Sequence, residues 1–158
     1  MDKEVLSALQ GLCAKREYCI SDIRRKALDR LEGNREEAEE IVESLVADKF
    51  VDNARYASAF AREKSSLQGW GPVKIRFQLR AKGISEADIS CALAEIDADK
   101  ASARLKRLLE SKWKTLEEDP QGRLKLIKFA LSRGYEYPEV ESLIKELTLS
   151  ARQPTNRG

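Results

Sequence analysis

The 158-residue chain contains no histidine, and this absence narrows the chemistry that we expect of it. Histidine is the commonest general base near neutral pH and a frequent metal ligand, so its absence argues against most nucleophilic triads and most zinc sites. The three cysteines, Cys13, Cys19 and Cys91, are odd in number and have no CxxC spacing. We therefore expect reduced thiols, with Cys13 and Cys91 buried on apolar helix faces, and no catalytic residue, metal or cofactor.

Other common signals are missing as well. The sequence has no GxxxxGK[ST] phosphate loop, so ATP hydrolysis by this chain is not expected. No apolar run approaches the roughly 20 residues of a membrane span, and no charged-then-apolar leader stands at the N-terminus. The close carboxylates Glu36 and Glu40 lie in the first turn of an expected helix, where they favour its dipole, so they are interpreted as structural. We expect a cytoplasmic protein that is not an enzyme.

The composition is that of a highly helical protein. Charged residues make up 35% of the chain, hydrophobic residues 42% and aromatic residues only 6%. Few stretches alternate β-branched residues, which disfavours strands. The predicted fold class is all-α.

A glycine followed by a helix-start signal occurs three times, and each marks a corner between two helices. The glycines are Gly33, Gly83 and Gly134, followed by Asn34 with Glu37, Ser85 with Asp88, and Pro138. Glycine favours the left-handed angles that close a helix, and a Ser or Asn three residues before an acid resembles a capping box. Proline suits the first position of a helix because it has no N–H to leave unpaired.

The apolar residues around these corners match in register. The three sets are Ala27, Leu31, Ile41 and Leu45; Ile75, Leu79, Ile89 and Leu93; and Leu126, Ala130, Val140 and Ile144. The offset from Leu31 to Leu79 is 48 residues, and that from Leu79 to Ala130 is 51. Because each unit also has room for a helix before its corner, we predict three tandem three-helix repeats and about nine helices.

The predicted boundaries are 1–51, 52–97 and 98–149 for the repeats, with a disordered tail at 150–158. The alternative is a single irregular helical domain whose corners match by chance, since capping residues and i, i+4 apolar spacing are both common.

Charge is unevenly distributed along the chain. Residues 1–51 have 9 basic and 12 acidic side chains, residues 52–97 have 7 and 6, and residues 98–158 have 13 and 9, which gives net charges of −3, +1 and +4. The middle helix of each unit is basic, and the stretch 71–82 contains no acid. Two interpretations stay open: a repeated cationic contact surface, or ordinary solvated helix faces.

Several segments resemble the RecX family of bacterial recombination regulators. They are FVDNARYASAFAREK followed by GWGPVKIRFQLRAKGIS, the upstream KREYCISDIRRKAL, and the downstream LIKFALSRGYEYPEVESLIKEL. The resemblance implies three tandem three-helix bundles in an elongated, curved protein, expected to be a monomer. It also implies a partner, the RecA recombinase assembled as a filament on single-stranded DNA. RecX-like proteins restrain the ATPase, strand-exchange and coprotease activities of that filament, in DNA repair and the SOS response.

Residues that match the family motif fall mostly in structural positions. They are Asp52, Arg55, Tyr56, Ala57, Phe60, Gly69, Gly71, Leu79, Lys82, Gly83 and Ile84. Tyr56 and Phe60 share a helical face and are expected in the core with Ile75 and Leu79. This chain has Asn53 where the family usually has a second acid, and Cys19 where it usually has Ser, which leaves the helix cap to Ser21.

We assign partner contact to basic side chains of the first two units and to one tryptophan. The candidates are Lys15, Arg16, Arg24, Arg25, Arg55, Lys74, Arg76, Arg80, Lys82 and Trp70. Trp70 lies between two glycines, and two roles stay open for it. Its indole either stacks on a nucleic-acid base or fills a pocket of a protein partner, or it pins its loop to its own bundle. Trp113 is expected to pack between units.

Two other classes of function stay open. One is a stand-alone protein that binds single- or double-stranded DNA, although the small net charge of +2 argues against strong binding. The other is a generic helical adaptor that binds a different protein through its acidic first unit.

Overall fold

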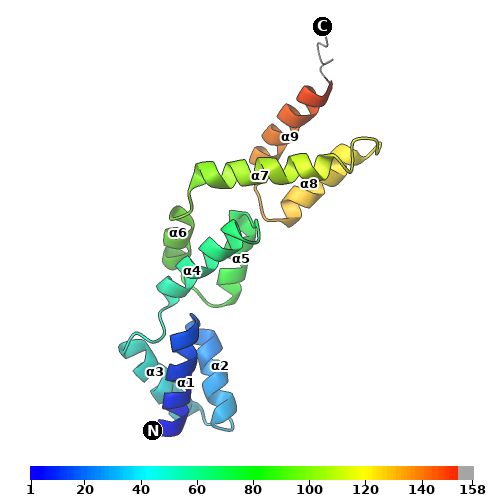
Figure 1. The fold of residues 1–158 in the computed structure, drawn as a ribbon. Helices are drawn as coiled ribbons and strands as arrows, with labels where there is room; N and C mark the ends of the chain where they lie inside the picture. The colour runs from blue at the N-terminus through cyan, green and yellow to red at the C-terminus, as the bar shows by residue number, and fades with distance from the viewer. Residues whose placement is uncertain (153–158) are drawn as a thin grey trace. The chain divides into compact units, whose positions relative to one another are not determined.

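The computed structural model describes residues 1–152, and within that range it forms nine α-helices and no strand (Figure 1). The prediction of an all-α fold with nine helices is confirmed. The helices are α1 (Lys3–Lys15), α2 (Ile20–Arg30), α3 (Arg35–Ala47), α4 (Asn53–Ser66), α5 (Pro72–Ala81), α6 (Glu86–Ala94), α7 (Ala98–Trp113), α8 (Gly122–Ser132) and α9 (Tyr137–Arg152). No helix in this range is long and apolar enough to cross a membrane.

The described chain divides into two compact units. The first combines Met1–Arg62 with Phe77–Glu95, and the second combines Glu63–Arg76 with the chain from Ile96 onward. Helices α4 and α5 of the middle repeat therefore contribute to both units. The three repeat boundaries stay a prediction. Helix α9 continues to Arg152, and the rest of the tail expected to be disordered, 153–158, lies outside the described residues.

The helix starts follow the predicted capping chemistry in the first two repeats. The side chain of Asn34 accepts a hydrogen bond from the backbone N–H of Glu37, and that of Ser85 accepts one from Asp88, both at 3.2 Å. In the third repeat α9 begins at Tyr137, so Pro138 occupies the second helical position rather than the first. Proline is tolerated there because the first four N–H groups of a helix have no partner within it.

The corners repeat with a period of 51 residues, which corrects the register of the first one. Each middle helix ends with a backbone bond spanning five residues: Gly33 N–H to Leu28 O, Ile84 N–H to Leu79 O, and Tyr135 N–H to Ala130 O. On the core-facing sides of the three middle helices, the buried pairs are Ile23 and Ala27, Ile75 and Leu79, and Leu126 and Ala130, so Ala27, rather than Leu31, is the counterpart of Leu79. Moving four residues along a helix keeps nearly the same face, so apolar spacing alone did not separate the two registers.

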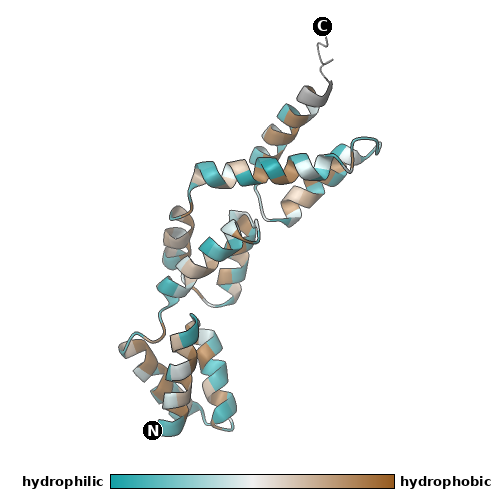
Figure 2. Ribbon diagram, in the orientation of Figure 1, coloured by the Kyte–Doolittle hydropathy of each residue, from teal (hydrophilic) through white to brown (hydrophobic). Residues whose placement is uncertain are grey.

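Buried aliphatic residues form the cores of the first and third repeats. In the first repeat, residues from α1, α2 and α3 pack together, among them Leu9, Ile23, Ala27, Ile41 and Leu45. In the third, α7, α8 and α9 contribute Leu105, Leu109, Leu126, Ala130, Val140 and Ile144. Hydrophobic and hydrophilic residues occupy different sides of these helices (Figure 2). Burying one apolar stripe per helix is what stabilises such small bundles.

In the middle repeat, Tyr56, Ile75 and Leu79 are buried as expected. Phe60 is only half-buried and stacks on Tyr56 with the ring centroids 5.9 Å apart. Trp113 corrects an expectation, because it packs against the core of the third repeat instead of between repeats. Its long helix places the indole over its own bundle.

The cysteines are free, but their burial differs from the prediction. Cys91 is exposed, Cys13 is half-buried, and Cys19 is the buried thiol. Cys91 lies on α6 beside buried Ala92 and two residues after buried Ile89, so the helix turns its thiol outward. Burial and the neighbouring Glu17 raise the pKa of the Cys13 thiol, although Arg55 opposes this.

Candidate interaction surface

The basic side chains assigned to partner contact lie in different settings. Several are held by carboxylates or carbonyls of the same chain, Lys74, Arg76 and Arg80 lie on the middle helix α5, and Lys15 and Arg16 lie at the end of α1. The distinction matters because a charge bound to its own fold supports that fold whatever else it touches.

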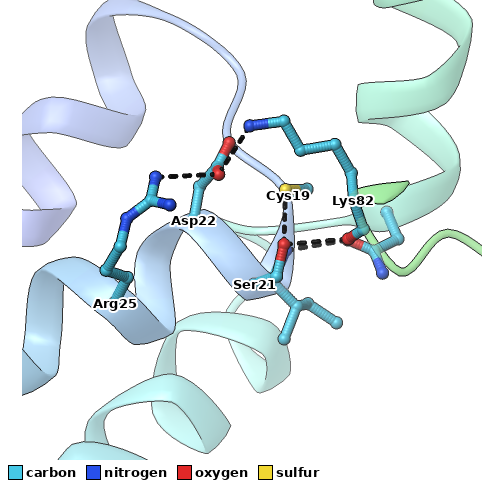
Figure 3. A network of polar contacts seen from close by, with 7 residues as sticks. Cys19, Ser21, Asp22, Arg25 and Lys82 are labelled. Atoms are coloured by element: carbon cyan, nitrogen blue, oxygen red, sulfur yellow. Dashed lines mark hydrogen bonds and ion pairs between the residues drawn. The ribbon is translucent and has the colours of Figure 1, made fainter. Parts of the chain in front are cut away.

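Lys82 is held by its own chain, in a polar network that joins α2 to the end of α5 (Figure 3). Its ammonium lies 2.9 Å from Asp22 Oδ1, and Arg25 donates to the same oxygen at 3.2 Å. Asp22 is 7% exposed, so its carboxylate requires these partners. The Ser21 hydroxyl donates to the carbonyl of Lys82 at 2.8 Å. Ser21 therefore does not cap α2 as expected; Cys19 holds the cap position without a side-chain bond.

The charge balance in this network sets the protonation of Asp22. Burial raises the pKa of the carboxyl, but hydrogen bonds from Lys82 and Cys19 and the charges of Lys82 and Arg25 outweigh it, so the pKa is lowered overall. Asp22 is thus held as a carboxylate at neutral pH.

Arg55 forms a second link between the start of α4 and the first repeat. Its guanidinium donates to Glu17 Oε1 at 2.7 Å and to the backbone carbonyls of Lys49 and Phe50 at 3.0 and 3.2 Å. Beside it, Asn53 Oδ1 accepts the N–H of Ile20 at 2.8 Å. Asn53, which departs from the family pattern, thus pairs a backbone donor at the first turn of α2.

The remaining first-repeat candidates are partly engaged. Arg24 forms an ion pair with Glu39 at 2.5 Å, which lowers the pKa of that carboxyl. The Arg16 guanidinium lies over the ring of Tyr18, 4.7 Å from its centroid. Lys15, in the last turn of α1, is exposed.

Trp70 is held by its own surroundings. The Lys64 and Lys74 ammonium groups lie 4.9 and 4.3 Å from its ring centroid, and its backbone N–H donates to the carbonyl of Lys64 at 2.9 Å. The geometry agrees with the interpretation that Trp70 pins its loop. The Trp70 side chain is half-buried, with the Lys64 and Lys74 ammonium groups on its ring.

The start of α5 bonds to the corner that follows α8. The N–H groups of Gly71 and Val73 donate to the carbonyls of Arg133 and Gly134 at 2.7 and 2.9 Å, and the Tyr135 hydroxyl donates to Gly69 O at 2.9 Å. Two glycines permit the approach: a Cβ on Gly71 would lie 2.4 Å from Gly134 O. Burial raises the pKa of Tyr135.

Helix α5 carries three of the candidates and contains no acidic residue, and α8, whose basic residues were not assigned to contact, contains none either. On α5, Arg80 is exposed and pairs with Glu86, while Arg76 is half-buried. On α8, Arg123, Lys125 and Lys128 are exposed. Lys125 pairs with Asp119 at 2.6 Å.

The apolar residues on the outward faces of α5 and α8 were not predicted from the sequence. Val73 and Phe77 on α5 are 49% and 68% exposed, and Leu124 and Leu131 on α8 are 49% and 41% exposed. The signal was present in the sequence, since Val73 and Phe77 repeat the i, i+4 spacing of the buried pair Ile75 and Leu79 two residues out of register.

These features define an all-α protein of tandem three-helix corners whose middle helices present basic and apolar side chains. The family model described as RecX, second three-helix domain, matches residues 52–93. Regulatory protein RecX of Actinobacillus pleuropneumoniae serotype 5b is 31% identical over 133 residues, which is 82% of this chain and 83% of the relative. The chain belongs to the RecX family of regulatory proteins.

Other similarities agree. Regulatory protein RecX of Clostridium tetani is 29% identical over 116 residues, 71% of this chain, and the match spans only 53% of that relative's length. A crystal structure of regulatory protein RecX superposes with a TM-score of 0.80 at 25% identity, covering 91% of this chain and 71% of the other. Its fold is consistent with tandem three-helix repeats.

Proposed function

We propose that this protein binds RecA filaments assembled on single-stranded DNA and restrains their ATPase, strand-exchange and coprotease activities. Membership of the RecX family supports a regulatory role. The observation that carries the proposal in this chain is the pair of acid-free basic middle helices, α5 and α8, since a repeated cationic face suits a partner that is itself a repeating array.

In this proposal the chain acts by contact, as a monomer in the cytoplasm, and supplies no catalytic group or cofactor. The candidates for contact are the side chains of α5 and α8 that point outward, together with Lys15 and Arg16. Arg55 and Lys82 act mainly by holding the first two repeats together, because each pairs with a carboxylate of the first repeat. Arg25 pairs with Asp22 on its own helix.

The test is the ATPase rate of a preformed RecA filament on single-stranded DNA as the protein is titrated in. We expect the rate to fall at protein concentrations well below that of RecA, because a protein lying along a filament acts on several protomers at once. An unchanged rate up to equimolar protein would contradict the proposal.

A second measurement, the affinity of the protein for DNA in the absence of recombinase, distinguishes a stand-alone DNA-binding protein from a filament regulator. With a formal net charge of +2, affinity for DNA alone should be weak and should fall steeply with salt. Tight, salt-dependent DNA binding together with an unchanged ATPase rate would favour a DNA-binding protein. Indifference to both partners would favour an adaptor for another protein.

A further inference from the structure

The outward face of α5 combines apolar and cationic side chains. Val73, 49% exposed, and Phe77, 68% exposed, lie four residues apart and so share one face, opposite the buried Ile75 and Leu79. Arg80 follows on the same side and is also exposed. Phenylalanine is among the residues enriched at the centres of protein interfaces.

The outward face of α8 also combines apolar and cationic side chains, one period later, and one apolar position is the same. Leu124 lies 51 residues after Val73 and has the same exposed fraction, 49%. Lys128 lies 51 residues after Phe77, and Leu131, 41% exposed, lies 51 residues after Arg80. Each helix thus exposes two apolar side chains with at least one cation among or beside them, and neither helix contains an acid.

The first repeat does not share this face. The residues of α2 that lie two positions before buried Ile23 and Ala27, as Val73 and Phe77 lie before Ile75 and Leu79, are Ser21 and Arg25. Neither side chain is apolar, and both have partners in their own chain. The apolar and basic face is therefore a property of the second and third repeats.

Single exposed apolar residues are common and require no explanation. The exposure of two apolar side chains on each of two acid-free helices, with Val73 and Leu124 at the same register position, is different, because nothing in the core of either bundle requires it. Apolar side chains among cations are complementary to an apolar pocket surrounded by carboxylates, in which the apolar groups supply affinity and the charges supply orientation.

We propose that the outward faces of α5 and α8 are two copies of one docking element. Phe77 with Val73, and Leu124 with Leu131, insert into apolar pockets rimmed by acidic side chains on successive protomers of a repeating protein partner. This inference rests on the proposed function, which supplies that partner as the RecA filament, and it adds the apolar residues that anchor the contact. Two linked anchors bind more tightly than either alone because the second contact becomes intramolecular.

The experiment compares paired alanine variants in binding to preformed RecA filaments on single-stranded DNA, measured by co-sedimentation. The test variants are V73A/F77A, L124A/L131A and the four-residue combination. The matched control is L67A/L149A, which removes two leucines that are 78% and 61% exposed but lie off the middle helices. Circular dichroism and thermal unfolding verify that every variant keeps its helical content.

We expect each test pair to weaken binding by about tenfold and the combination by about a hundredfold or more, with less than a twofold change for the control. Wild-type affinity in the four-residue variant, or an equal loss in the control, would overturn the inference. An effect of only one pair would overturn the claim of two copies. If the wild-type protein itself fails to bind the filament, the proposed function fails first, and the identity of the partner falls with it.

Discussion

Within residues 1–152, two residues other than glycine have left-handed backbone angles, and both lie at helix ends. Glu32 has φ 52° after α2, and Lys49 has φ 60° after α3. At the positions equivalent to Glu32, 51 and 102 residues further on, the later repeats have Gly83 and Gly134 with φ 78° and 93°. A side chain with a Cβ adopts this region at a cost of about 1 kcal/mol or more, which glycine avoids. Glu32 is therefore the strained member of the three corners.

Replacing Glu32 by glycine should stabilise the protein. We expect Glu32→Gly to raise the free energy of unfolding by about 0.5–1 kcal/mol, because relief of the left-handed strain exceeds the added entropy of the unfolded chain. Urea unfolding followed by circular dichroism measures the change. Glu32→Ala removes the same carboxylate but keeps the strain, so it should not stabilise; equal gains in both variants would contradict the explanation.

A methyl group at Gly71 should do the opposite. Its Cβ would lie 2.4 Å from Gly134 O and 2.7 Å from the Tyr135 nitrogen, so the start of α5 would have to move away from the corner after α8. We expect Gly71→Ala to lower the free energy of unfolding by about 1–3 kcal/mol. Gly11→Ala, where nothing lies within 4 Å, should instead stabilise α1 by about 1 kcal/mol. Thermal unfolding of the two variants compares these outcomes directly.

At the scale of elements, the N-termini of the middle helices have different partners. In the first turn of α2, groups donate hydrogen bonds to Asn53 and Lys82 of the next repeat. At the start of α5, backbone N–H groups donate to carbonyls of the corner after α8. The start of α8 is closed locally, where Asp119 accepts the N–H groups of Gln121 and Gly122 through its side chain and its carbonyl. Unpaired N–H groups at a helix start require such partners. Two of the three middle helices therefore depend on the following repeat for their first turn.

The ion pair of Asp22 and Lys82 should make stability depend on pH. The folded-state pKa of Asp22 lies below its unfolded value, so its contribution is present above the unfolded pKa and is lost as pH falls through the folded pKa. Asp22→Asn should lower the free energy of unfolding at pH 7 by about 2 kcal/mol. The free energy of unfolding of this variant should also fall less steeply than that of the wild type as the pH is lowered.

Chemical unfolding between pH 7 and pH 3 measures both effects. Asp29→Asn, at an exposed position of the same helix, serves as the control and should keep the wild-type pH dependence. A decline in Asp22→Asn as steep as that of the wild type would show that Asp22 is not the responsible group.

At the scale of the whole molecule, charge and exposed apolar groups gather on particular helices. The acidic excess lies before residue 52 and the basic excess after residue 97. The second and third middle helices carry cations without acids, whereas α2 carries Asp22 and Asp29 among its arginines. A partner with acidic pockets would be attracted to one part of the chain and repelled by another, which orients the encounter.

Reversing two charges on α5 should weaken partner binding without unfolding the protein. We expect Arg76→Glu with Arg80→Glu to preserve helical content and to reduce binding to RecA filaments by about tenfold or more, an effect that diminishes at high salt. Arg30→Glu with Arg35→Glu, at exposed positions of the first repeat, changes the net charge equally. If that control loses as much affinity, the effect is one of net charge and the face on α5 is assigned wrongly.

The sequence by itself determined the local structure. Helix starts at Asn34 and Ser85, the glycine turns at Gly83 and Gly134, the buried Ile75 and Leu79 and the all-α class were all predictable. Each depends on interactions between residues a few positions apart, such as a side chain capping its own helix. The quoted segments also carried enough of the family pattern to indicate the RecX family.

The tertiary structure alone decided which partner each side chain found. Lys82 and Asp22 are 60 residues apart in the sequence, and Arg55 and Glu17 are 38 apart, so no local pattern indicates that these charges are paired. Likewise Cys91 and Trp113 lie on helices that the sequence predicts, yet which side faces the core depends on how neighbouring helices pack. Helical periodicity specifies faces, and only packing between distant segments determines which face is buried and which is left to bind a partner.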